Sequence, residues 1–153
     1  MNDLTLSPSS DQPPVAVLQR RLEDRQLCLM ERGFRSTGGI VSGDDVARLL
    51  RRRSDQPLSM LARWIVSREV VHFEWRSRTL LPLFQFELST MRLRPEVTAI
   101  VRELEDVFDD WTMALWFAKP NSWLDDAAPA EVIYRDGRAV MNAARTVRFV
   151  ARG

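Results

Sequence analysis

The chain of 153 residues is long enough for one domain or two small ones, and its 45% apolar and 28% charged residues are typical of a folded, soluble protein. Segment 1–14 has neither the basic start nor the apolar centre of a signal peptide, and the longest apolar run, 113–118, is far shorter than the roughly 20 residues that cross a bilayer. We therefore expect a soluble, cytoplasmic protein rather than a secreted or membrane-spanning one.

The net charge of +1 conceals a strong separation of charge along the chain. Segment 35–94 contains 11 arginines and six acids, segment 95–136 contains ten acids and three bases, and segment 137–153 contains four arginines and no acid. Such separation suggests two surfaces, one for an anionic partner and one for a cationic or mixed partner. The alternative is that the basic and acidic parts simply pack beside each other.

Segment 1–34 is predicted to be a flexible lead-in followed by one helix. Residues 1–13 are rich in Ser, Pro and Asp, and Pro14 stands at a natural helix start. Cys28, the only cysteine, is expected to be buried in this helix, which indicates a reducing compartment. The helix could act as a dimerisation or packing arm and is expected to stop at Gly33. Its apolar stripe consists of Val15, Leu18, Leu22, Leu29 and Met30.

Segment 35–94 is predicted to form two short helices after a glycine-containing linker, residues 33–41. Ser42 and Asp45 have the spacing of a capping box at the start of the first helix. The helix is expected to end at Arg51–Arg53, where cations suit the helix dipole. A break of four residues follows. The second helix is expected to bury one apolar face, which consists of Leu58, Leu61, Ala62 and Ile65.

Beyond these helices the apolar period changes from 3.6 residues to 2, which predicts a β-hairpin. Val71, Phe73 and Trp75 lie on one face of its first strand, and His72 lies on the polar face. The turn is expected at Arg76–Arg78. The returning strand has an apolar face of Leu80, Pro82, Phe84 and Phe86 and a polar face of Gln85 and Glu87.

Segment 95–153 is predicted to be helical throughout. Its first helix is the clearest amphipathic helix of the chain, with an apolar stripe of Val97, Ile100, Val101, Leu104, Val107 and Phe108. A second helix starts near Asp109 and stops before Pro120, a short one begins at Pro129, and the last covers about 138–151. The expected fold class is therefore mainly α with a small β-hairpin (α+β).

Residues that could carry out catalysis or bind a metal are nearly absent. One histidine, His72, and one cysteine cannot build a structural zinc site, and no nucleophile–base pair is suggested. Gly38-Gly39 lacks the flanking pattern of a phosphate-binding loop. The aspartate pairs at 109–110 and 125–126 stand beside helix starts, where capping explains them. We therefore expect no enzymatic activity, no cofactor and no metal.

The segment from Ser42 to Glu87 has the order of a winged helix-turn-helix, with two short helices around a turn and then a hairpin. Such a module places its second helix in the major groove and its hairpin along the DNA backbone. Trp64 fits either a helix boundary or the exposed face. The alternative is a structural or protein-binding module with the same layout. The predicted DNA-contacting residues are Ser59, Arg63, Ser67, Arg68, Arg76 and Arg78.

A more specific pattern occurs at residues 116–129, WFAKPNSWLDDAAP. It resembles the toxin-binding domain of Xre/MbcA/ParS antitoxins, and the resemblance covers about residues 95–153. Asp126 stands where that family has a glycine, and the N-terminal half is the winged pattern rather than the usual helical Xre domain. The residues in register with the family pattern are Trp116, Pro120, Asn121, Leu124 and Pro129.

In that family the domain dimerises and covers the active-site entrance of a RES-domain toxin that consumes NAD. The resemblance implies that this chain occludes a RES-type toxin, with the last helix and tail as the plug. The alternatives are a solvated polar face on that helix and a core position for Trp111, Trp116 and Trp123, although tryptophan is also enriched in binding hot spots. The expected toxin-binding residues are Trp116, Pro120, Asn121, Trp123, Leu124, Arg138, Asn142, Arg145 and Arg152.

These features together predict three parts: a lead-in with a helix (1–34), a winged helix-turn-helix-like module (35–94) and a helical toxin-binding-like domain (95–153). We expect a homodimeric antitoxin that occludes its toxin and represses its own operon through DNA binding. The alternatives are a stand-alone DNA-binding regulator that uses the helical part for dimerisation, and an adaptor protein that never touches DNA.

Overall fold

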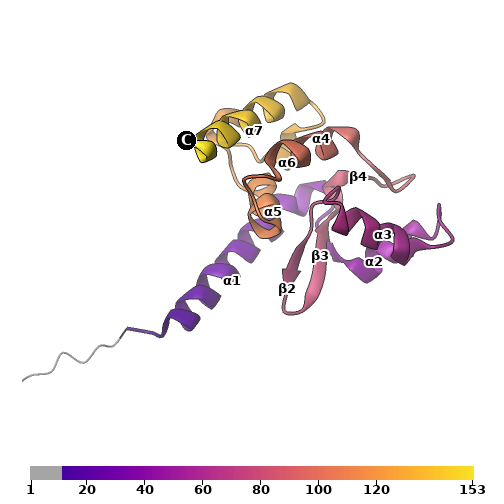
Figure 1. Cartoon of the computed structure of the whole chain (residues 1–153), viewed down its shortest axis with the longest axis horizontal. Coiled ribbons are helices and arrows are strands. Elements are labelled where there is room, and N and C mark those ends of the chain that lie inside the picture. The colour runs from indigo at the N-terminus through magenta and orange to yellow at the C-terminus, as the bar shows by residue number, and fades with distance from the viewer. Residues whose placement is uncertain (1–11) are drawn as a thin grey trace, which may run out of the picture.

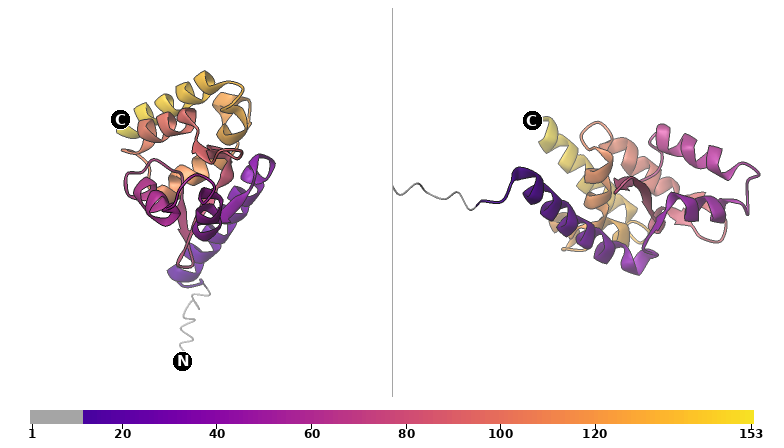
Figure 2. Two further views of the ribbon diagram at one scale, coloured as in Figure 1. Left: turned by 90° about the vertical axis from the view of Figure 1, so that its right-hand side faces the viewer. Right: turned by 90° about the horizontal axis from the view of Figure 1, so that it is seen from below.

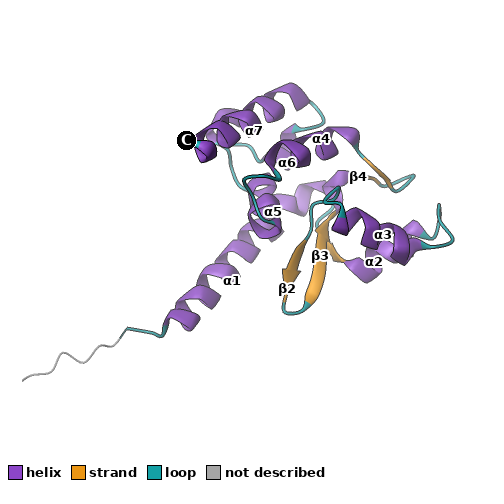
Figure 3. Ribbon diagram, in the orientation of Figure 1, coloured by secondary structure: helices purple, strands orange, loops and turns teal. Residues whose placement is uncertain are grey.

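The structure, a computed structural model, describes residues 12–153; most of the predicted lead-in therefore lies outside the described residues. The chain is mostly helical with a small antiparallel sheet, as expected (Figure 3). The helices are α1 (Val15–Phe34), α2 (Gly43–Leu50), α3 (Pro57–Val66), α4 (Pro95–Leu104), α5 (Asp110–Ala118), α6 (Pro129–Val132) and α7 (Gly137–Arg152). The strands are β1 (Ile40–Ser42), β2 (Phe73–Trp75), β3 (Arg78–Pro82), β4 (Phe86–Glu87) and β5 (Arg92–Leu93). Among the described helices, none combines the length and the apolar character that a membrane crossing requires.

Most helix starts follow from short-range signals in the sequence. The Ser42 hydroxyl accepts from the Asp45 amide at 3.2 Å and the Asp45 carboxylate accepts from the Ser42 amide at 3.4 Å, which confirms the capping box of α2. Asp109 caps α5 in the same way, by accepting from the Thr112 amide at 2.8 Å. Prolines occupy the first helical position of α3, α4 and α6, where a missing N–H costs nothing.

The main sheet has three antiparallel strands in the order β1-β3-β2. The β2–β3 hairpin confirms the predicted change of period, whereas β1 was expected to be part of a linker. Side chains alternate between the two faces of the sheet. Phe73 and Leu80 contact one cluster of apolar residues, and Val41 and Leu81 contact another. The sheet therefore lies between two cores (Figures 1 and 2).

The first cluster, which we call the larger core, joins the end of α1 to β2 and to α4–α7. Phe34 stacks on Phe84 with ring centroids 5.4 Å apart, and Phe84 packs on Phe117 at 5.0 Å. Helix α1 approaches α5 closely at Gly33. Only glycine fits there, because a side chain at this position would collide with the carbonyl group of Ala118. The larger core thus draws on all three predicted parts of the chain.

The second cluster, the smaller core, packs α2 and α3 against the opposite face of the sheet. Its buried residues are Val46, Leu50, Leu61, Val70, Leu81, Phe86 and Met91. Trp64 is half-buried and lies 6.1 Å from Phe86, so it packs inward rather than outward. A second small sheet, formed by β4 and β5, closes this side and was not predicted.

Two predictions about apolar faces are wrong. Along α1 only Met30 and Phe34 are buried, while Val15, Leu18 and Leu22 are exposed, because the first half of the helix projects from the body (Figure 1). Cys28 is exposed as well. In α3, Leu61 is buried but Leu58 and Ala62 are exposed, because α2 and the sheet cover only one side of this helix.

The turn between α2 and α3 and the strand after β3 also differ from the prediction. Helix α2 ends at Leu50, so Arg51–Arg53 lie in a six-residue connection and not in the last helical turn. The returning strand is interrupted by a 3₁₀ turn, Leu83–Gln85. That turn carries Gln85 into the interior, although the alternation had placed it on a polar face. Within α4, by contrast, the expected stripe is buried as predicted at Val97, Ile100, Val101 and Leu104.

Candidate functional site

Two of the predicted DNA-contacting residues, Ser59 and Arg63, lie on the outer face of α3. Ser59 and Arg63 are exposed, and their side chains form no hydrogen bond or ion pair with another residue of 12–153. Ser67 is exposed too, but its hydroxyl oxygen lies 2.5 Å from the Arg63 carbonyl oxygen and 2.8 Å from a Glu69 carboxylate oxygen, so its single proton is shared between two acceptors within the chain. Ser67 therefore closes the C-terminal end of α3 and is a poor donor for DNA.

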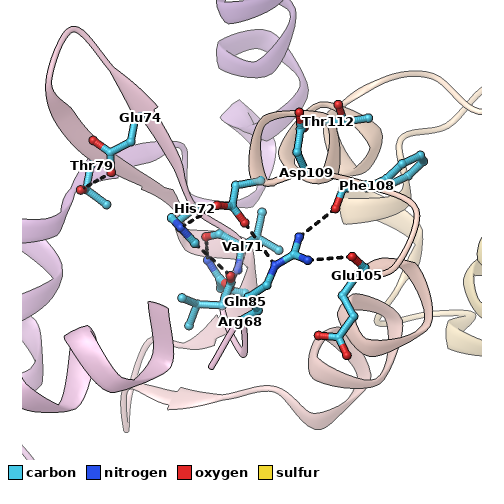
Figure 4. Close-up of polar contacts among 12 residues, drawn as sticks. Arg68, Val71, His72, Glu74, Thr79, Gln85, Glu105, Phe108, Asp109 and Thr112 are labelled. Carbon is cyan, nitrogen blue, oxygen red and sulfur yellow. Dashed lines mark hydrogen bonds and ion pairs between the residues drawn. The ribbon is translucent and has the colours of Figure 1, made fainter. Parts of the chain in front are cut away.

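Arg68, which was predicted to contact DNA, instead forms contacts within the fold. Its guanidinium donates to the carbonyl oxygens of Glu105 at 2.7 Å and Phe108 at 2.8 Å, and pairs with the Asp110 carboxylate at 3.4 Å (Figure 4). The backbone of Arg68 has a φ of 52°, a left-handed conformation that turns the chain away from α3. Arg68 thus ties the end of α3 to the connection between α4 and α5.

His72 and Gln85 lie beside this arginine and are both buried (Figure 4). His72 was expected on a polar strand face, yet it is only 6% exposed, with Nε2 3.3 Å from the Asp110 carboxylate and Nδ1 3.3 Å from the Val70 carbonyl oxygen. The Gln85 side chain accepts from the Val71 amide at 2.7 Å and donates to the Val71 and Pro82 carbonyl oxygens at 2.8 and 2.9 Å. These contacts satisfy backbone groups that no strand partner reaches.

Asp109 and Tyr134 have shifted pKa values for local reasons. Hydrogen bonds from the Thr112 side chain and amide lower the pKa of Asp109 below its ordinary value of 3.8, while partial burial opposes them and Arg68 adds a smaller lowering. Burial raises the pKa of Tyr134 well above its ordinary range, although Arg94, whose guanidinium lies 4.2 Å over its ring, opposes that effect. The Tyr134 hydroxyl donates to the Phe84 carbonyl oxygen. Both groups serve the fold.

The hairpin tip holds the other two predicted DNA-contacting residues. Because Trp75 pairs with Arg78, the turn contains only Arg76 and Ser77, and both have positive φ angles, 48° and 63°. Arg76 is exposed and lies over the Trp75 ring at 5.2 Å. Arg78 is exposed and borders a recess of about 350 Å³, which it shares with Leu58 and Ala62 of α3.

Two further recesses continue this surface around the start of α3. One, of about 430 Å³, lies between the end of α2 and the first turn of α3 and is bordered by Arg51 and Ser59. The next, of about 390 Å³, is bordered by Ser59 and Arg63. Because neighbouring recesses share lining residues, the hairpin tip, the outer face of α3 and the end of α2 form one continuous surface.

Residues 116–129 include the end of α5, a tight connection at 119–128 and the first residue of α6. The Asn121 side chain accepts from the Trp123 amide at 2.9 Å, and the Asn121 backbone bridges to Ala127. Asp125 and Asp126 have φ angles of 54° and 63°, so Asp126 adopts the left-handed conformation that a glycine would favour at this position. Of the predicted toxin-binding residues here, Leu124 is buried, Trp116 is half-buried, Asn121 is half-buried, and Pro120 and Trp123 are exposed.

The predicted plug helix, α7, packs against α4 by the expected side: Val140 and Ala144 are buried. Arg138, Asn142 and Arg145 are exposed on the opposite side. Arg152 is exposed but is held by the Asp106 carboxylate at 2.8 Å, next to an Arg148–Glu103 pair at 3.1 Å. Arg152 is therefore partly neutralised within the chain.

One residue of this outer face was overlooked. Phe149 is 78% exposed and lies seven residues after Asn142, which places it on the same side of α7 as the free arginines. The i, i+4, i+7, i+11 spacing of Arg138, Asn142, Arg145 and Phe149 is the signal that would have identified it.

Within residues 12–153, no three side chains of the His, Cys, Asp and Glu types come close enough together to bind a metal ion.

Comparison with known protein families, with curated proteins and with solved structures found no match for this chain. The two surfaces described above, around α3 and along α7, are the features on which a functional interpretation depends.

Proposed function

We propose that the chain is an antitoxin-type regulator with two binding surfaces. The surface of α3 and the β2–β3 hairpin would contact DNA, and the surface formed by residues 116–129 and α7 would bind and occlude a RES-type toxin. A homodimer is part of this proposal, since paired modules would contact two half-sites of an operator. Occlusion needs no catalytic group, so the proposal requires only complementary surfaces.

The order of elements in the first half is the observation that carries the DNA-binding part. Helix α1, strand β1, helices α2 and α3 and the β2–β3 hairpin follow one another, and β1 pairs with β3 in the sheet. This is the order of a winged helix-turn-helix, in which the helix at the position of α3 enters the major groove. The exposure of Ser59 and Arg63 on α3, and of Arg78 across a recess from Leu58 and Ala62 of the same helix, supports this assignment.

A different observation favours toxin binding by the second half. The loop at 116–129 keeps a left-handed backbone at Asp126, the position at which Xre/MbcA/ParS antitoxins have glycine. The outer face of α7 adds Arg138 and Arg145, which have no ion-pair partner among residues 12–153, and the exposed ring of Phe149. Aromatic and arginine side chains are the residues most enriched in binding hot spots.

A double substitution tests the DNA-binding part. Arg63→Ala with Arg76→Ala should weaken binding to duplex DNA of the chain's own promoter region, measured by fluorescence anisotropy, and leave toxin capture intact. Arg138→Ala with Arg145→Ala should do the reverse. Unchanged DNA affinity in the first variant would contradict DNA binding through α3 and the β2–β3 hairpin.

Affinity purification of the tagged chain from its native host, followed by mass spectrometry, tests the toxin-binding part. Recovery of a RES-domain protein that is lost with Arg138→Ala and Arg145→Ala would support occlusion through α7. Recovery of DNA alone would leave a stand-alone transcriptional regulator. If neither is recovered, the remaining reading is an adaptor that uses the same folds for protein contacts.

A further inference from the structure

We infer that this protein holds DNA chiefly by its phosphates, along a basic edge formed by Arg51, Arg52 and Arg63, and that it reads few bases. The inference deepens the proposed DNA-binding function and rests on it. It assigns a role to two arginines at the end of α2 that the sequence pattern attributed only to the helix dipole.

The chemistry of the outer face of α3 limits base readout. Two of its exposed large side chains are apolar, Leu58 at 66% and Val66 at 84% exposed. Ser67 is occupied by contacts within the chain, as described above. Ser59 and Arg63 are thus the two side chains of this face that could form hydrogen bonds with base edges. Direct readout of a site usually needs several such donors and acceptors in the major groove.

The three arginines after α2 have different surroundings. Arg53 donates to the Met91 carbonyl oxygen at 3.0 Å and lies over the Trp64 ring at 5.9 Å, so its guanidinium is held against residues of the smaller core although the residue is exposed. Arg51 and Arg52 are exposed, and within residues 12–153 neither forms an ion pair or a side-chain hydrogen bond. Their full positive charges are available to an anionic partner.

The positions of these charges fit a polyanion that runs past the start of α3. Arg51 borders the recess on one side of Ser59, and Arg63 borders the recess on its other side. The acid that borders both recesses is Asp55, and Asp44 borders the first, where Arg48 is already paired with Asp45 at 3.3 Å. Phosphate contacts of this kind position a protein on the duplex but carry no sequence information.

The hairpin tip is a weaker candidate for the same role. Arg76 lies over its own Trp75 and borders a groove of about 760 Å³ whose other lining includes four carboxylates, those of Glu23, Asp24, Glu74 and Asp109. These carboxylates reduce the local positive potential that a phosphate would meet. The recess that Arg51 borders is lined by two carboxylates, those of Asp44 and Asp55, half as many as the groove beside Arg76.

Fluorescence anisotropy with the full chain and two labelled duplexes of roughly 25 base pairs, one from its own promoter and one with the same bases shuffled, tests the inference. The variant is Arg51→Ala with Arg52→Ala. Its matched control is Arg102→Ala with Arg135→Ala, which removes the same charge from exposed positions outside both surfaces. Affinities are measured between about 50 and 200 mM NaCl.

The slope of log affinity against log salt is negative, and loss of two phosphate contacts should make it shallower by about 1.8. This change corresponds to an affinity loss of about 30-fold at 0.15 M salt. The loss should be equal on both duplexes, and the control should bind like the unmodified chain. Unchanged binding by the Arg51/Arg52 variant, or a loss confined to the promoter duplex, would overturn the inference while leaving the proposed function in place. An unmodified chain that fails to bind either duplex at low salt would overturn both.

Discussion

The two faces of the central sheet are covered in different ways. On one side, the larger core joins the end of α1 to α4–α7 and buries large aromatic residues, such as Phe34 and Phe117, completely. On the other side, the smaller core is covered by α2, α3 and the short β4–β5 pair, and α3 leaves Leu58 and Val66 exposed. The larger core connects most of the helices, whereas the smaller core buries only the inner face of α3 and leaves the outer face of that helix exposed.

Polar side chains, rather than apolar ones, connect the two cores. Gln85 bonds to the backbone of Val71 and of Pro82, and Arg68 bonds the end of α3 to the α4–α5 connection. A buried polar connection of this type stabilises one arrangement strongly, because every alternative leaves backbone groups unpaired. We therefore expect the two cores to unfold together. The first two predictions below test this connection, and the other two test contacts of α5 in the larger core.

The largest effect is expected from Gln85→Leu. This change keeps the volume of the side chain but leaves the Val71 amide and carbonyl and the Pro82 carbonyl without partners in the interior. Since each buried unpaired group costs about 1–3 kcal/mol, we expect a loss of about 3–5 kcal/mol in the free energy of unfolding, measured by urea denaturation. The matched change at the exposed Gln19 should cost less than about 0.5 kcal/mol. A cost below 1 kcal/mol at position 85 would contradict the role of Gln85 as a connection.

Arg68→Ala should lower the free energy of unfolding by about 2–3 kcal/mol, because it removes two charge-assisted hydrogen bonds to carbonyl oxygens and the Asp110 pair. Arg63→Ala, in the exposed part of α3, is the control and should be neutral within about 0.5 kcal/mol. If the cores separate, tryptophan fluorescence and far-UV circular dichroism of the Arg68 variant will report two transitions. Coincident transitions would show that the cores remain coupled.

Gly33→Ala tests the close contact within the larger core. The added methyl group would collide with the Ala118 carbonyl group and force α1 away from α5, at a cost of about 1–3 kcal/mol in thermal or urea unfolding. Gly137→Ala, at the start of α7, has no atom within 4 Å of the added carbon and should be neutral or slightly stabilising. Equal behaviour of the two variants would show that α1 can shift without loss.

The smallest effect concerns the cap of α5. Asp109→Ala should cost about 1 kcal/mol, because the Thr112 amide loses its acceptor. The pKa of Asp109 is lowered in the folded chain, so its contribution is complete above the ordinary value of 3.8 and is lost as pH falls through the lower folded value. The difference between the unmodified chain and Asp109→Ala should therefore shrink below about pH 4. A difference that grows on acidification would contradict the assigned cause.

Local signals predicted much of the secondary structure. The capping box at Ser42, the prolines that open α3, α4 and α6, the cap at Asp109 and the period of the hairpin all act within about one helical turn. Elements that depend on pairing with distant residues were missed, among them β1 and the β4–β5 pair. A strand of three residues carries too short a pattern to be distinguished from a loop.

The candidate surfaces were predicted in part. Ser59, Arg63, Arg76 and Arg78 are exposed as expected, and so are Arg138, Asn142 and Arg145, because the polar side of an amphipathic helix is readable from its spacing. Arg68 was misassigned, since the same spacing cannot reveal that carbonyl groups of the α4–α5 connection accept from it.

The sequence by itself determined where most helices begin, that the chain is mainly helical with a β-hairpin, and how its charges are distributed. Only the tertiary structure decided that Gln85, His72 and Arg68 are used internally while Leu58, Phe149 and Cys28 face outward. The physical reason is that capping and periodicity are properties of neighbouring residues, whereas burial and pairing depend on which elements, far apart in the chain, come to lie against each other.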